Sequence, residues 1–179
     1  MHKSSANTFP QQQGAVLIIS LIILLVLTVI GIAGMRTTVL EEKMASNSFD
    51  QNTAFQAAEA ALRDGEDTVN GLVTTASFDG TNGRLGSSDS DPDWFDSATW
   101  DPNNATSIAY SGTLSDVKTQ PRYIIKFIGQ AANNTGSLKT VGYGVHKTST
   151  VNDFRVTARG TGKSDNSQVI LQTYYGKNM

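Results

Sequence analysis

An uninterrupted apolar run near the N-terminus dominates the hydrophobic pattern of the chain. Residues 15–35 carry no charge, and Ser20 and Thr28 are their only clearly polar side chains. A helix of about 20 such residues is about 30 Å long, which matches the hydrocarbon core of a bilayer. A secretory signal peptide would have a shorter apolar core, of about 7 to 15 residues. The run therefore predicts a single transmembrane helix.

The pattern after this run predicts that the helix continues as an amphipathic segment, residues 36–73. No proline occurs between Pro10 and Pro92, and alanines raise the helix propensity of residues 54–61. A water-facing helix of this length needs a packing partner along one side. Apolar residues recur at spacings of three, four and seven, which predicts one buried stripe. This stripe consists of Phe55, Ala58, Leu62, Val69 and Val73.

Two places weaken the predicted helix. Gly31 and Gly34 each cost about 1 kcal/mol relative to alanine in a helix interior. Residues 46–52 are rich in Ser and Asn, whose side chains compete for backbone hydrogen bonds. Two interpretations of the glycines stay open: close packing against a neighbouring helix, or a segment that loosens during assembly.

Residues 74–120 have the composition of a long loop, with Gly, Asp, Asn and Ser clusters and few aliphatic side chains. A loop of this length inside a compact domain usually has a function or is mobile. Trp94, Phe95 and Trp100 interrupt its polar sequence. We expect them to anchor the loop to the domain; the alternative is a contact patch for a partner, since aromatic residues dominate interfaces.

Strand patterns begin at residue 121. Tyr123, Ile125 and Phe127 alternate with other residues and share one predicted face. Short polar connections favour antiparallel neighbours. We therefore predict an α+β fold in which a four-stranded antiparallel sheet, within residues 121–179, packs on the amphipathic half of the helix. The predicted strands are 122–128, 138–146, 154–159 and 168–175.

The net charge of −2 is unevenly distributed. Residues 35–73 carry three cations and seven acids, residues 74–120 two cations and seven acids, and residues 121–179 eight cations and two acids. We expect charge complementarity within the chain or between subunits; the alternative is a basic face that binds DNA. The chain has no cysteine, which excludes disulfides, thiol catalysis and thiolate metal sites.

Candidate chemistry is sparse. Asp89, Asp91 and Asp93 have the alternating spacing that opens a calcium loop, but Trp94 and Trp100 stand where an EF-hand needs Gly and Glu. We therefore expect a solvated acidic loop, with no metal and no cofactor. His146 is the only histidine outside residues 1–14, and no hydrolase, Walker or zinc-protease motif occurs. The sequence predicts a protein that is not an enzyme.

Two sequence features resemble a known family. Gln-Gln-Gln-Gly at residues 11–14, followed by an apolar run, resembles a class III signal, and residues 35–47 and 54–62 resemble the PilX-type minor pilins of type IV pili. This resemblance implies that a prepilin peptidase cuts between Gly14 and Ala15 and that Ala15 is N-methylated. The leader, residues 1–14, would be removed.

The resemblance also implies location and partners, which the flanking charges do not settle. It places residues 15–35 in the inner membrane and later in the filament core, with the head in the periplasm and then in the extracellular pilus. The implied partners are other minor pilins, the major pilin, a tip adhesin and the prepilin peptidase. Whether the pilus serves twitching motility, adhesion or DNA uptake stays open.

The fifth residue of the implied mature chain departs from the family. Most type IV pilins have glutamate at this position, where it is thought to neutralise the N-terminal amine of the subunit above; this chain has Ile19. A buried ammonium is costly unless it is paired. Ile19 therefore suggests a subunit at or near the tip that primes pilus assembly. The alternatives are a type II secretion tip pseudopilin, a plain single-span periplasmic binding protein, and a DNA-binding module.

Overall fold

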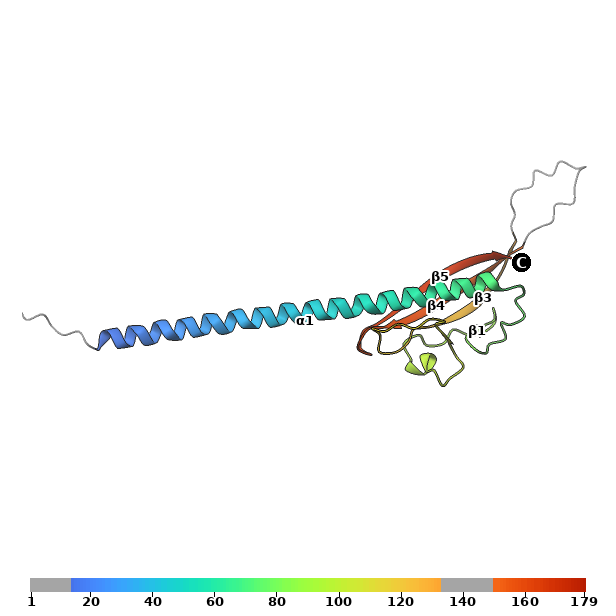
Figure 1. Cartoon of the computed structure of the whole chain (residues 1–179). Helices are drawn as coiled ribbons and strands as arrows, with labels where there is room; N and C mark the ends of the chain where they lie inside the picture. Colours follow the sequence, from blue (N-terminus) through green and yellow to red (C-terminus); the bar gives the residue numbers. More distant parts are fainter. Residues whose placement is uncertain (1–13, 133–149) are drawn as a thin grey trace, which may run out of the picture. The chain divides into compact units, whose positions relative to one another are not determined.

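The computed structural model describes residues 14–132 and 150–179, and it contains one long helix and one sheet (Figure 1). The described residues divide into two units between Ser46 and Asn47, and the helix α1 (Ala15–Gly71) belongs to both. Residues 46–52, which the sequence marks as a weak point, are helical, and the helix ends two residues before Val73. The remaining elements are β1 (Arg84–Leu85), the 3₁₀ helix η1 (Ser97–Trp100), β2 (Ile108–Ala109), β3 (Arg122–Ala132), β4 (Thr150–Thr161) and β5 (Gln168–Asn178).

The α+β prediction is confirmed, with a sheet that is mostly antiparallel. Its strand order is β1-β3-β4-β5, and β2 also pairs with β3. The long strands β3, β4 and β5 are antiparallel neighbours, whereas the two-residue strand β1 runs parallel to β3. The predicted strand 138–146 lies outside the described residues. Residues 150–153, expected in a connection, belong to β4 and pair with β3.

Small residues form the contact between the helix and β4. Gly160 lies so close to the helix that a Cβ atom would be 2.3 Å from the Ala54 carbonyl oxygen. A Cβ atom on Gly65 of the helix would lie 2.5 Å from Val156. Only small side chains fit between surfaces at this distance. The buried helix residues are accordingly Ala54, Ala57, Ala58, Ala61, Gly65 and Val69.

The predicted apolar stripe is therefore only partly correct. Ala58 and Val69 are buried and Leu62 packs at the edge of the core, but Phe55 is 45% exposed and Val73 is 88% exposed. The sequence pattern placed the bulky side chains at the contact, because apolar periodicity does not reveal how closely two backbones approach.

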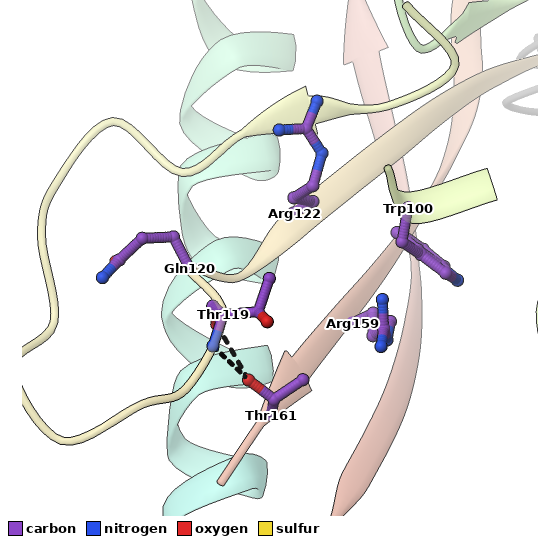
Figure 2. A pocket seen from close by; sticks show the side chains of 6 residues that line it. All are labelled: Trp100, Thr119, Gln120, Arg122, Arg159 and Thr161. Carbon is purple, nitrogen blue, oxygen red and sulfur yellow. Dashed lines mark hydrogen bonds between the residues drawn. The ribbon is translucent and has the colours of Figure 1, made fainter. Parts of the chain in front are cut away.

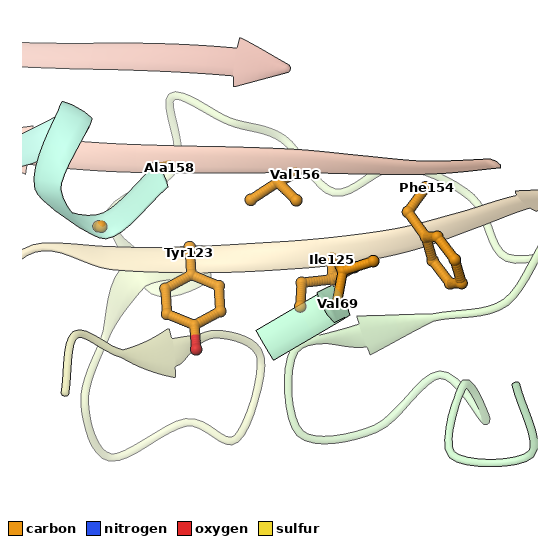
Figure 3. Packing of buried hydrophobic residues seen from close by; sticks show 7 residues of the cluster. Val69, Tyr123, Ile125, Phe154, Val156 and Ala158 are labelled. Atoms are coloured by element: carbon orange, nitrogen blue, oxygen red, sulfur yellow. The ribbon is translucent and has the colours of Figure 1, made fainter. Parts of the chain in front are cut away.

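The core lies between this helix face and β3 and β4 (Figure 3). Tyr123 and Ile125 are buried and Phe127 packs against them, which confirms the predicted face of β3. The Tyr123 hydroxyl is 2.9 Å from the Thr68 hydroxyl of the helix. Burial raises the pKa of Tyr123, because the phenolate would lose its hydration there. Ile124, on the opposite face of β3, is also buried, so both faces of this strand are covered.

Residues 74–120 were expected to form a loop without secondary structure, and this is wrong in detail. The segment contains β1, η1 and β2, and both strands pair with β3. Asp96 caps η1, because its carboxylate accepts a hydrogen bond from the Ala98 N–H at 2.9 Å. Such short-range bonds give the segment a fixed backbone over the second face of the sheet.

Candidate functional site

The N-terminal part of the helix is an exposed apolar surface. Every residue from Gly14 to Phe49 is exposed, and an 18-residue window has a mean hydropathy of 3.2. The two hydroxyls in the apolar run are satisfied internally: Ser20 donates to the Leu17 carbonyl and Thr28 to the Leu25 carbonyl. The segment is long and apolar enough to cross a bilayer once, and it fits a single-pass membrane anchor.

The residues predicted to be processed lie at the start of this helix. Gly14 precedes the helix in a turn, Ala15 is its first residue, and Ile19 is exposed one turn later. Gly31 and Gly34 lie in the same helix, and no atom lies within 4 Å of where their Cβ atoms would be. The described residues of the chain thus give these glycines no packing partner.

Asp50 joins the helix to the turn between β4 and β5. Its carboxylate accepts hydrogen bonds from the Ser164 hydroxyl, at 2.7 Å, and from the Lys163 N–H. The hydrogen bond from Ser164 contributes most to lowering the pKa of Asp50 below its usual value. Asp50 is also the first helix residue that is partly buried. Burial of the helix therefore begins at this side chain.

Lys177 binds the other end of the helix. Its ammonium donates to the carbonyl oxygens of Val69 at 3.1 Å, of Leu72 at 2.5 Å, and of Asn70. The last carbonyls of a helix have no intrahelical partner, and a cation there also interacts favourably with the helix dipole. β5 thus supplies the cap of α1.

The second face of the sheet is basic, and the preceding loop covers it. Asp91 accepts hydrogen bonds from Lys126, at 2.8 Å, and from Arg155. Burial raises the pKa of Asp91, but these two cations outweigh burial, so the pKa lies below its usual value. Trp94 covers Arg155, with 5.9 Å from the guanidinium carbon to the ring centroid. Charge complementarity within the chain, as the sequence predicted, is confirmed at this point.

Lys126 binds two oxygen atoms of the segment that resembles the start of a calcium loop. Its ammonium donates to the Asp89 carbonyl oxygen at 2.6 Å as well as to Asp91. The Asp89 and Asp93 carboxylates accept instead from the N–H groups of Gly86 and Phe95. The described part of the chain contains no cluster of three or more His, Asp or Glu that could hold a metal. The expected solvated acidic loop is wrong for Asp91, which is paired with the sheet.

The aromatic residues of the loop divide into two kinds. Trp100 is 2% exposed, its Nε1–H donates to the Trp94 carbonyl, and the two rings are 6.2 Å apart. The anchor prediction is confirmed for Trp100, and Trp94 is partly buried beside it. It is wrong for Phe95, which is 89% exposed, because the backbone turn at Asp93 directs that side chain outward.

Four of the six described basic residues after residue 120 are engaged. Lys126 and Arg155 bind Asp91, Lys177 caps the helix, and Arg122 donates to Ser107. Of the described basic residues after 120, only Lys163 is exposed. His146, Lys139 and Lys147 lie outside the described residues. The described residues therefore form no exposed basic face of the kind that DNA binding needs.

Two family models match the chain. The model described as PilX N-terminal matches residues 13–63, and the model described as Type IV pilus assembly protein PilX C-term matches residues 45–177. No match was found among curated proteins or among solved structures. The second match alone covers more than half of the chain. The chain therefore belongs to the PilX family and is a PilX-type minor pilin of the type IV pilus, from a family that is structural and not enzymatic.

Proposed function

We propose that this minor pilin is located at or near the pilus tip and primes pilus assembly together with other minor pilins and a tip adhesin. The observation that supports this most is Ile19, which stands where most type IV pilins have a glutamate. A subunit that enters below another one uses this glutamate to neutralise the amine above it. A subunit with no neighbour above has no amine to neutralise.

The helix offers no substitute for the missing carboxylate. After Gly14 the first acidic residue is Glu41, 22 residues beyond Ile19. At 1.5 Å per residue this is about 33 Å along the helix axis. An unpaired ammonium in an apolar environment is unfavourable. The chain is therefore poorly suited to sit below another pilin and well suited to be the first subunit.

The proposal includes the processing of the leader. The prepilin peptidase cuts between Gly14 and Ala15 on the cytoplasmic side, and Ala15 becomes N-methylated. Before assembly, the processed chain stays in the inner membrane with its head in the periplasm. It then leaves the membrane as a subunit of the growing pilus. Its exposed apolar helix packs against the helices of neighbouring pilins, and small residues such as Gly31 and Gly34 would allow close approach.

The first experiment is the intact mass and N-terminal sequence of the protein from membranes, with and without the prepilin peptidase. We expect a chain that starts at N-methylated Ala15 only when the peptidase is present. A chain that still starts at Met1 would identify a plain single-span membrane protein and would contradict the assembly role.

The tip location is tested by labelling. An epitope added after Met179, which is exposed, should be detected by immunogold at one end of each pilus. Label along the whole filament would exclude a tip subunit. Ile19→Glu should leave the number of pili unchanged, with Ile22→Glu as the control for a carboxylate outside the fifth position. If pili formed only with Ile19→Glu, the reasoning from this residue would be refuted.

A further inference from the structure

The basic face of the sheet carries two cross-strand pairs of cations, and only one of them has a carboxylate. The register of β3 and β4 places Lys126 opposite Arg155 and Arg122 opposite Arg159. Asp91 binds both members of the first pair. Among the described residues, no carboxylate lies within ion-pair distance of Arg122 or Arg159. Like charges directly opposite each other destabilise a sheet unless something compensates them.

Arg159 lacks partners although it is half-buried. Its Nε atom, like that of Arg155, is inaccessible to solvent and has no hydrogen-bond partner among the described residues; unlike Arg155, Arg159 also has no ion-pair partner among them. Burial lowers the pKa of Arg159, and the charge of Asp165, which forms no ion pair with it, opposes this shift only in part. A buried donor without a hydrogen-bond partner destabilises the folded protein, because the donor has lost its hydration and gained no hydrogen bond in its place.

Arg122 is only partly satisfied. Its Nε donates to the Ser107 hydroxyl at 2.7 Å, and its Nη2 donates to the Ser107 carbonyl at 2.5 Å. Burial lowers the pKa of Arg122 as well, with Asp101 as the more distant compensating acid. Neither guanidinium therefore has the direct carboxylate contact that the neighbouring pair has through Asp91.

The two arginines line the same shallow hollow (Figure 2). The hollow has no space for a water-sized molecule, so a ligand group can contact the guanidinium groups only at its solvent-facing rim. Figure 2 shows Arg159 and Trp100 among the side chains that line this hollow. The lining residues are Trp100, Thr119, Gln120, Arg122, Arg159 and Thr161.

We propose that Arg159, assisted by the charge of Arg122, binds a carboxylate from a neighbouring pilus subunit. A guanidinium presents two parallel N–H groups that match a carboxylate. The first cation pair shows, in the same sheet, that this chain pairs such cations with an Asp side chain. A carboxylate side chain on the surface of a neighbouring subunit can contact such a rim without entering the hollow. This inference rests on membership in the pilus and not on location at its tip.

Acetate tests the chemistry on the full-length protein in detergent. Thermal unfolding is followed by the fluorescence of Trp94 and Trp100, in sodium acetate and in sodium chloride at equal ionic strength. We expect acetate, at concentrations about tenfold above its dissociation constant, to raise the midpoint by about 3 °C. Arg159→Gln should abolish this rise, and Arg122→Gln should reduce it.

Lys163→Gln is the matched control, because Lys163 is an exposed cation on the neighbouring β4–β5 turn. It should retain the acetate effect. The Arg159→Gln variant should fold, because the substitution removes a half-buried charge that has no direct partner. The midpoint of its thermal unfolding in sodium chloride checks that it is folded. If acetate had no effect on the wild-type protein, the carboxylate site would be refuted.

Incorporation into pili tests the source of the carboxylate. The amount of this chain per sheared pilus should fall at least tenfold in Arg159→Gln and stay at the wild-type level in Lys163→Gln. Acetate binding without this loss would mean that the site takes small anions from solution, and it would overturn the proposed subunit contact. Immunogold labelling of the tip does not depend on the contact of Arg159. A failure of the proposed tip location can therefore be distinguished from a failure of the proposed carboxylate contact.

Discussion

Replacing Gly160 with alanine should destabilise the head more than any other single methyl group added to β4 or β5. The new Cβ atom would lie 2.3 Å from the Ala54 carbonyl oxygen and 2.3 Å from the Ala58 nitrogen. Both are backbone atoms of the helix, so no side-chain rotation can relieve the overlap. The shortest ordinary contact of a Cβ atom is 3.4 Å. The helix must therefore retreat by about 1 Å.

This displacement of the helix weakens every contact between the sheet and the buried small residues of the helix. A gap of 0.5 to 1 Å forfeits about a quarter to a half of the dispersion energy of each contact. These small residues include Ala54, Ala57, Ala58 and Ala61, all essentially inaccessible to solvent. Overpacking a core costs about 1 to 3 kcal/mol, and we expect a loss near the upper end, about 3 kcal/mol, because backbone lies on the helix side of the overlap.

Urea unfolding of the full-length protein in detergent measures this loss. Trp94 and Trp100 are the only tryptophans and both lie in the head, so their fluorescence reports on it selectively. Gly176→Ala is the matched control, because its Cβ would meet the Val151 side chain at 3.0 Å, and that side chain can move. We expect it to cost less than about 1 kcal/mol. Equal stability of the two variants would refute the close approach of helix and sheet.

Three further variants test the attachments of the head, each by urea unfolding. Lys177→Met should lower the free energy of unfolding by about 2 kcal/mol, because carbonyl oxygens at the helix end lose a charged donor. The control variant Lys163→Met should change this free energy little. Asp91→Asn should cost about 1 to 2 kcal/mol, since Lys126 keeps a neutral partner in place of a charged one and partial exposure reduces the effect. The pKa of Asp50 is lower in the folded state than in the unfolded state. Its contribution to the free energy of unfolding is therefore present above the unfolded-state pKa and is lost as the pH falls through the folded-state pKa. Asp50→Asn should flatten the dependence of this free energy on pH below about pH 4.

The sequence predicted the elements whose apolar pattern is regular. The long helix begins at Ala15 as expected, and Tyr123 and Ile125 occupy the predicted face of β3. In such segments the burial of apolar side chains determines the structure, and the order of apolar and polar residues in the sequence shows which side chains are buried. The family resemblance of residues 35–47 and 54–62 is confirmed by the two family matches.

The sequence could not predict features that depend on tertiary distance. The stripe through Phe55 was wrong because the glycine opposite, Gly160, decides which helix residues fit, and it lies about 100 residues away. β1 and β2 were missed because two-residue strands have no period. The ion pairs of Asp91 were missed as well, because the composition of the segment predicted a solvated acidic loop, and the sequence does not show that Lys126 and Arg155 lie beside it.

The contacts of the head assign different tasks to the two parts of α1. From Asp50 to Leu72, side chains of β4, β5 and their turn hold the chain at both ends, through Ser164 and Lys177, and at close range in between, through Gly160. Before Asp50 every described helix residue is exposed. An exposed apolar helix is unfavourable in water and favourable in a bilayer or among other such helices. The division therefore lets the anchor exchange lipid for neighbouring subunits while the head, stabilised by its own contacts, keeps its fold.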